Sequence, residues 1–154
     1  MTTSLAMQWV MRLEVDIGPE RLLGPVPEGE RIDYPIIGGS FAGPDIRGDV
    51  LPGGADYFLM RHDGVGVLDA RYQLRSDDGV VIDIHNRGLW VPTDAGRARM
   101  KSGVDPLPAE LYCRCTPVFR APTGRHDWLN WWVFTGSVDY PRPGIVAVNC
   151  FKLT

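Results

Sequence analysis

The strongest constraint on the fold is a two-residue alternation at the start of the chain. Between residues 5 and 17 every odd position carries a large apolar side chain, whereas the even positions are mostly small or polar. The odd positions are Leu5, Met7, Trp9, Met11, Leu13, Val15 and Ile17. In an extended strand, residues i and i+2 point to the same face. The pattern therefore predicts a long β-strand with one strongly apolar face.

Glycine and proline divide the remaining chain into short extended runs. The 154 residues include 18 glycines and 13 prolines, and these lie between apolar runs, which is typical of strands joined by turns. Further strands are predicted at residues 31–41, 46–50, 56–61, 65–75, 80–90, 112–120, 128–138 and 145–153. Asp78-Gly79 is a strong hairpin signal, so residues 56–90 are predicted to form a meander. Pro35 and Gly38-Gly39 predict an edge position, a bulge or a sharp bend in the second strand.

One segment has helical signals. Thr93 is a suitable N-cap for residues 94–101, and Gly103 is a suitable stop. We find no internal repeat, low-complexity tract or linker, so residues 1–154 are predicted to form one domain. Many strands with at most one short helix predict an all-β fold, a closed antiparallel barrel or a sandwich.

Composition narrows the function classes. The net charge of −3 argues against a nucleic-acid binder, which normally has a basic surface. No apolar run reaches the roughly 18 residues that a membrane-spanning helix requires. The first 18 residues lack a basic start and a cleavage site, so they are not expected to be a signal peptide. An odd number of cysteines without an export signal predicts a reducing, cytoplasmic location.

The cysteines do not predict a metal site. Cys113 and Cys115 are expected to lie on one face of a strand, and no second Cys/His pair has zinc-site spacing. No phosphate loop, dinucleotide fingerprint or nucleophile elbow occurs in the chain. Neither a metal nor a cofactor is therefore predicted. The chemistry that remains is general acid–base catalysis by side chains alone.

Several predicted strands carry polar side chains on one face. Asp69 and Arg71 share a face opposite Tyr72, and His85 lies on the face opposite Asn86. Such residues are usually the solvated outer face of a sheet, where ion pairs contribute little. Alternatively, they are the polar groups of an otherwise apolar ligand cavity. The alternation separates the two faces but leaves open which one points inward.

An aromatic cluster, Trp128, Trp131, Trp132 and Phe134, follows in a predicted strand. It is interpreted either as core and subunit contact or as a wall on which a flat ligand stacks. In a strand, Trp131 and Trp132 face opposite ways, so at most one of them lines a cavity.

Five motifs occur in order along the chain. They are Gly38-Gly39-Ser40-Phe41-x-Gly43-Pro44, Arg47-Gly48-x-Val50-Leu51-Pro52-Gly53-Gly54-Ala55-Asp56, Leu68-Asp69-Ala70-Arg71-Tyr72, Asn86-Arg87-Gly88 and Trp128-Leu129-Asn130. Over residues 7–153 this pattern resembles the domain-of-unknown-function family 3237. The resemblance implies a closed antiparallel β-barrel of about eight strands, similar to allene oxide cyclase. It also implies a cofactor-free cyclase or isomerase of natural-product pathways, for example one that adds a phenol hydroxyl across an alkene.

The leading hypothesis is therefore a cofactor-independent isomerase, cyclase or lyase that acts on a small aromatic or polyketide-like metabolite. The predicted catalytic residues are Asp69 as general acid or base, Tyr72 or His85 as alternative proton carriers, Arg71 and Arg114 as enolate or phenolate stabilisers, and Asn86 as an orienting group. The predicted substrate-binding residues are Arg47, Asp56, Trp128, Asn130 and Phe134. The doubled Trp131-Trp132 and the two cysteines Cys113 and Cys115 depart from the family pattern and leave the substrate open. The alternative is a non-catalytic barrel that binds a small hydrophobic ligand.

The apolar face of the first strand also predicts an assembly. A barrel has one interior, and a ligand cavity reduces the apolar surface that it buries. A strand at 128–134 that is apolar on both faces needs cover on its outer side. Exposed apolar patches mark contacts, and two-fold symmetry is the commonest arrangement. We therefore expect a homodimer with Trp131 or its neighbours at the interface.

Overall fold

The computed structural model describes residues 3–154 as a ring of antiparallel strands. The strands are β1 (Met7–Ile17), β2 (Arg21–Val26), β3 (Gly29–Ala42), β4 (Arg47–Val50), β5 (Ala55–Arg61), β6 (Gly66–Ser76), β7 (Val81–Pro92), β8 (Leu111–Arg120), β9 (Phe134–Arg142) and β10 (Ile145–Leu153). The helices are α1 (Asp94–Lys101) and two 3-10 turns, η1 (Pro108–Glu110) and η2 (Asp127–Asn130). None of the helices in residues 3–154 is long and apolar enough to cross a membrane.

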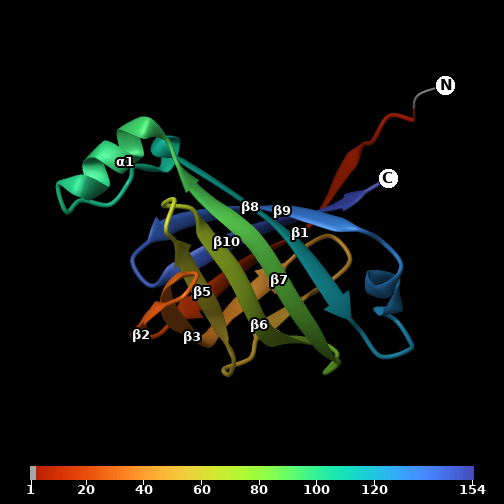
Figure 1. Cartoon of the computed structure of the whole chain (residues 1–154). Helices are drawn as coiled ribbons and strands as arrows, with labels where there is room; N and C mark the ends of the chain where they lie inside the picture. Colours follow the sequence, from red (N-terminus) through yellow and green to blue (C-terminus); the bar gives the residue numbers. More distant parts are fainter. Residues whose placement is uncertain (1–2) are drawn as a thin grey trace.

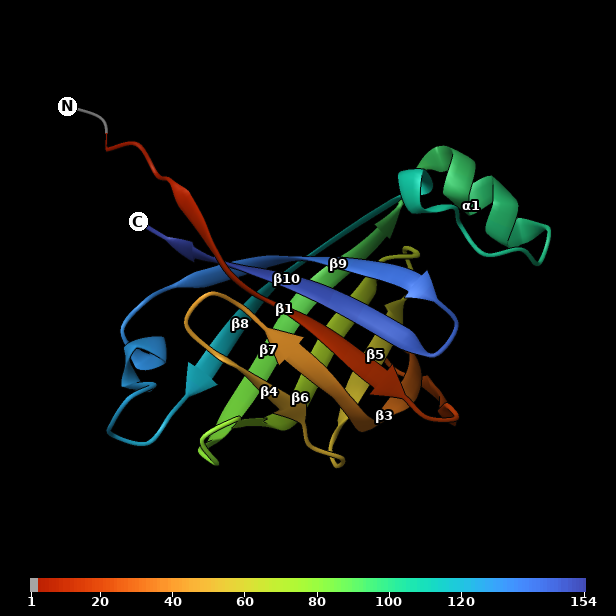
Figure 2. The ribbon, with the colours of Figure 1, turned by 180° about the vertical axis from the view of Figure 1, so that it is seen from behind.

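The ring closes because β3 pairs with β1. From β1 the order runs through β10, β9, β8, β7 and β6, and then β4 and β5 both connect β6 to β3. Figures 1 and 2 show the strands wrapping around a common interior, with α1 at one end and η2 at the other. The predicted closed, all-β, barrel-like fold with one short helix is confirmed.

The first strand changes face within its length. Trp9 pairs with Phe151 but Met11 pairs with Cys150, so Val10 is an extra residue that forms a β-bulge. Before the bulge the odd-numbered side chains stay outside, and Leu5, Met7 and Trp9 are exposed. After the bulge they enter the interior, and Met11, Leu13 and Val15 are buried. One uninterrupted apolar pattern therefore supplies both an outer surface and the core.

The predicted strand at residues 128–138 is wrong in its first half. Residues 127–130 form η2, Trp131 and Trp132 lie in the bend that follows, and β9 begins only at Phe134. The Asn130 side chain causes this, because it donates to the Ala121 carbonyl and accepts from the Ala121 N–H. Such local side-chain bonds compete with a strand. Trp131 and Trp132 are both exposed, so the expected division between two strand faces does not occur.

Two other expectations change in the same region of the sheet. Residues 21–26, expected to be a loop, form β2, which pairs with β3. The β3 strand is not at an edge, since it also contacts β1, β4 and β5. The predicted bulge lies beside its glycine pair, where the register with β1 shifts and Ile37 is the extra residue. A Cβ on Gly39 would lie 2.1 Å from the Glu14 carbonyl oxygen. Close approach of two backbones therefore requires glycine there.

The predicted helix is confirmed, and it lies at one end of the ring. Thr93 accepts a hydrogen bond from the Gly96 N–H, as an N-cap does. At the opposite end, η2 and the strands around it hold apolar side chains that are almost fully buried: Leu74, Ile82, Ile84, Phe119, Leu129 and Phe134. The apolar side chains that pack on this core from its margins are only partly buried: Ile17, Ile32, Tyr34, Met60, Ala70, Val80, Trp90, Leu111, Trp128 and Val146.

Candidate functional site

A polar layer crosses the interior on three adjacent strands. Asp56 on β5 pairs with Ala70 on β6, and Ala70 pairs with Asn86 on β7. Ala70 lies on the same face of β6 as the buried Leu68, and Asn86 lies on the same face of β7 as the buried Ile84, so both point inward. Asp56 lies on the face of β5 opposite the exposed Tyr57. Neighbouring strands lie about 5 Å apart, so about 10 Å separates the Asp56 and Asn86 backbones. Only the Ala70 methyl group stands between them in this layer.

Asp56 is the carboxyl group of this layer. Its Oδ1 accepts a hydrogen bond from the Asp69 N–H at 2.8 Å. Burial raises the pKa of Asp56 to about 6, and the negative charges of Asp69 and Asp33 act in the same direction, whereas the Asp69 N–H and Arg31 oppose the shift. A carboxyl group that titrates near neutrality both accepts and returns a proton under physiological conditions.

Hydroxyl and thiol groups lie close enough to Asp56 for its charge to affect them. Burial, with a smaller contribution from the Asp56 charge, raises the pKa of Tyr34, Tyr72 and Tyr140 above the usual tyrosine value. The same causes raise the pKa of Cys113 to about 12. The Cys113 Sγ lies 3.8 Å from the Tyr140 hydroxyl. All four groups therefore stay protonated at neutral pH and are hydrogen-bond donors around one titrating carboxyl group.

Asn86 offers an unused acceptor. The residue is 5% exposed. Its Oδ1 is buried and has no hydrogen-bond partner among the residues that the structure describes. A buried carbonyl oxygen without a donor costs about 1–3 kcal/mol, and a ligand hydroxyl or N–H would reach this oxygen only after the side chains around it moved.

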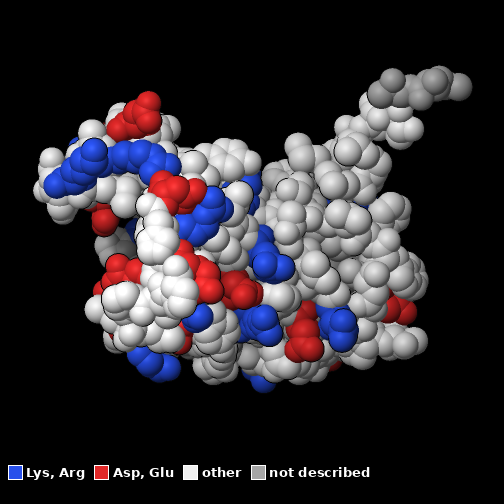
Figure 3. Space-filling model, in the orientation of Figure 1, with Lys and Arg blue, Asp and Glu red and all other residues white. Residues whose placement is uncertain are grey.

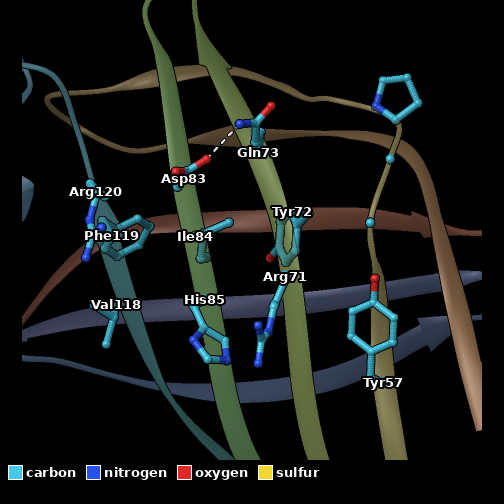
Figure 4. A pocket seen from close by; sticks show the side chains of 13 residues that line it. Tyr57, Arg71, Tyr72, Gln73, Asp83, Ile84, His85, Val118, Phe119 and Arg120 are labelled. Atoms are coloured by element: carbon cyan, nitrogen blue, oxygen red, sulfur yellow. Dashed lines mark hydrogen bonds between the residues drawn. The ribbon is translucent and has the colours of Figure 1, made fainter.

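Three predicted catalytic residues come together on the outer face instead. The His85 Nε2 lies 2.6 Å from the Asp69 Oδ1, and the Arg71 Nε lies 3.7 Å from the same oxygen. Arg71 and His85 border an open groove of about 660 Å³ on the outside of β5–β8, in which their side chains lie next to each other (Figure 4). Charged side chains of both signs intermingle on this face (Figure 3). Exposed pairs of this kind contribute little to stability.

The other predicted residues lie away from this polar layer. Arg114 donates to the Cys113 carbonyl and covers the Tyr112 ring at 5.0 Å, and exposed Arg47 pairs with Asp77. Phe134 is 2% exposed at the η2 end of the ring, where it contacts Phe119 and Trp128. Asn130 is held by Ala121, as described above. No group of three or more His, Cys, Asp or Glu side chains suited to a metal occurs within residues 3–154.

The interior therefore receives only part of the predicted set. Tyr72, Asn86 and Asp56 lie inside, although Asp56 was predicted only as a binding residue. Sequence reasoning missed Tyr34, Cys113 and Tyr140 as site residues. Alternation along β7 from the motif residue Asn86, followed by the β7–β8 pairing, places Cys113 on the same face and could have identified it. Tyr140 had no such signal, because the neighbouring prolines made its segment look like a turn.

The closed antiparallel ring and its acid-bearing interior define a small β-barrel-like protein. The chain belongs to the family described as "Protein of unknown function (DUF3237)", which matches residues 5–153. It is similar to the UPF0311 protein RPA1785 of Rhodopseudomonas palustris, with 33% identity over 138 residues that cover 89% of this chain and 90% of the relative. The crystal structure of RPA1785, described as a conserved protein of unknown function, aligns with a TM-score of 0.89 and 28% identity over 99% of this chain and 100% of that one.

Two further solved structures share the fold. A beta-barrel like protein of Acinetobacter baumannii has a TM-score of 0.87 and 26% identity, and the alignment covers 100% of this chain and 99% of that one. An enzyme from Penicillium herquei has a TM-score of 0.74 and 18% identity, and the alignment covers 100% and 98% of the two chains. The second likeness concerns the fold alone.

Proposed function

We propose that this protein is a cofactor-independent isomerase or cyclase that binds a small aromatic or polyketide-like metabolite inside the ring. The general acid–base group is Asp56, not the outer-face Asp69. The observation that carries this proposal is the inward carboxyl group of raised pKa, which is close enough to the buried Tyr72 and Cys113 for its charge to raise their pKa values as well. The enzyme from Penicillium herquei supports it only as an example of catalysis on this fold.

The geometry suits a ring closure in which the proton that Asp56 takes from the substrate is returned to it. As a carboxylate, Asp56 takes the proton of a substrate hydroxyl, and the oxygen forms a bond to one carbon of an alkene that is conjugated to a carbonyl group. The alkene π pair moves toward the carbonyl oxygen, where a tyrosine hydroxyl such as Tyr72 or Tyr140 stabilises the developing enolate. Asp56 then returns its proton to the second alkene carbon. A C–O and a C–H bond form, the substrate O–H bond and the alkene π bond are lost, and the molecular formula is unchanged.

A non-catalytic binding barrel is the second candidate. Trp90 and Leu111 are partly buried on the inner side of the ring, and such apolar groups bind a hydrophobic ligand without any proton transfer. The two functions differ in a directly measurable way, because only the enzyme converts its ligand into a product.

The proposal is tested by a screen for conversion at constant mass. Phenolic and enone-bearing compounds that raise the melting temperature are selected, because a ligand of the folded state stabilises it by mass action. Each is incubated with the protein and followed by chromatography and mass spectrometry. We expect at least one to yield a product of identical mass and different retention time. Stabilising ligands that are all recovered unchanged would favour the carrier.

We also propose that a second copy of the chain covers the exposed apolar end of β1. Leu5, Met7 and Trp9 are 75%, 65% and 42% exposed, and Trp131 nearby is 70% exposed. Sedimentation is expected to give about twice the 17.1 kDa chain mass at micromolar concentration. Met7→Glu should shift the protein to the monomer, whereas Leu107→Glu, at an exposed position of the loop before η1, should not. A wild-type monomer would exclude the dimer.

A further inference from the structure

A second hollow lies at the end of the ring opposite α1. It has a volume of about 690 Å³ and lies between the start of β1, the end of β10, the β3–β4 loop and the η2 segment. Figures 1 and 2 place η2 and α1 at opposite ends of the molecule, so this groove is remote from α1. It contains residues that the proposed reaction does not use, among them Arg47 and Trp128.

Two indole rings border the groove. Trp128 is fixed by its tilted contact with Phe134, with ring centroids 6.3 Å apart. Trp132 is 44% exposed, although tryptophan usually buries most of its area. Two tryptophans beside one hollow are suited to a flat aromatic ligand, because aromatic rings attract one another in offset-stacked and edge-to-face arrangements.

Three basic side chains and two carboxylates, those of Asp45 and Asp77, border the same groove. Arg47 is paired with Asp77 at 3.1 Å, and Arg125 lies 3.6 Å from Asp78. Lys152 differs from both, because its Nζ lies 4.2 Å from the centroid of the Trp132 ring and forms no ion pair with a carboxylate of the described residues. The indole face holds the ammonium group in place. The positive charge of Lys152 is therefore available to a ligand.

We propose that this groove binds a planar aromatic anion, such as an aryl carboxylate or sulfonate. The anionic group pairs with Lys152, and the ring lies against the indoles of Trp132 and Trp128. This site is separate from the interior, and it does not depend on the proposed isomerase or cyclase activity.

Naphthalene-2-sulfonate is the probe, and its neutral sulfonamide is the matched control ligand. Binding is followed by NMR of the indole N–H signals, which are assigned with Trp→Phe variants, and by titration calorimetry. We expect the Trp128 and Trp132 signals to shift, and the sulfonamide to bind about 5-fold more weakly. Lys152→Gln should weaken sulfonate binding about 5-fold, and Trp132→Leu about 10-fold. Trp132 is exposed and Lys152 is half-buried near the end of β10, so folding should be retained in both variants.

Two control variants test whether binding is specific to this groove. Lys101→Gln removes the chain's other lysine, which is exposed on α1, and should leave the affinity unchanged. Asp56→Asn changes the interior and should also leave it unchanged. The proposal is overturned if the two indole signals do not move, or if the sulfonamide binds as well as the sulfonate. It is equally overturned if Lys101→Gln weakens binding as much as Lys152→Gln, or if Asp56→Asn abolishes binding.

Discussion

Asp56→Asn is expected to reduce turnover about 10²–10⁴-fold, the usual contribution of one positioned general acid or base. The amide keeps the shape of the carboxyl group and still accepts the hydrogen bond from the Asp69 N–H. It does not take up a proton at neutral pH. In the wild type, kcat/KM should rise with pH through about 6 as Asp56 ionises, and it should then level off. The variant should show no such rise.

The same variant should stabilise the fold above pH 6. The folded state holds the Asp56 proton up to a pKa of about 6, whereas the unfolded chain releases it near 3.8. The folding stability that protonated Asp56 contributes is therefore present in full below pH 4 and is lost as the pH rises through 6. The loss is on the order of 2–3 kcal/mol, at about 1.4 kcal/mol per pKa unit. Asp56→Asn avoids that loss.

Thermal melts between pH 4 and pH 8 measure this difference. The variant should melt several degrees above the wild type at pH 8 and close to it at pH 4.

Asp69→Asn, on the outer face beside His85, is the matched control for the turnover measurement and should retain turnover. Full activity in Asp56→Asn would remove this carboxyl group from the mechanism. Loss of activity in Asp69→Asn alone would restore the outer-face residue as the candidate.

Gly54→Ala is expected to destabilise the protein by about 3 kcal/mol or more. Gly54 has a φ of +73°, and a Cβ there would lie 2.0 Å from the Arg71 carbonyl oxygen. The left-handed conformation costs a non-glycine residue about 1–2 kcal/mol, and overpacking adds about 1–3 kcal/mol. The backbone cannot move away easily, because the Gly54 carbonyl accepts from the Ile36 N–H. Urea unfolding measures the loss.

Gly103→Ala separates the two contributions. Gly103 has a nearly identical φ of +76°, but a Cβ there would meet no atom within 4 Å. This control should therefore lose only about 1–2 kcal/mol, from the backbone conformation alone. Equal losses in the two variants would show that the contact with β6 is unimportant. Because Gly54 directly precedes β5, the experiment also tests how firmly the strand that carries Asp56 is held.

Much of the secondary structure was predictable because it depends on local pattern. Side chains alternate along a strand whatever the rest of the molecule does, so the final strand, 145–153, was predicted with the bounds that the structure has. The Thr93 cap and the Gly103 stop likewise act within their own segment. The strand at 21–26 was missed because Gly24 and Pro25 weaken its local signal. Pairing with β3 outweighs that weakness.

The site was less predictable, because side chains from distant strands form it. Alternation showed that Asp69 and Arg71 lie opposite Tyr72, but it did not show which face is inside. The closed ring decided this: Tyr72 is buried in the interior, and Arg71 is exposed. The acid of the candidate site is therefore Asp56, whose raised pKa depends on burial that no local pattern reports.

The sequence by itself determined an all-β chain with one short helix, since period-two patterns and turn residues act locally. Only the tertiary structure decided how those patterns are used. In β1 the alternation runs unbroken from Leu5 to Ile17, yet the bulge at Val10 places its first part outside and its second part in the core. The physical reason is that a strand face has no inside until partner strands close around it. Here that closure came from β10 and β3 on either side of β1.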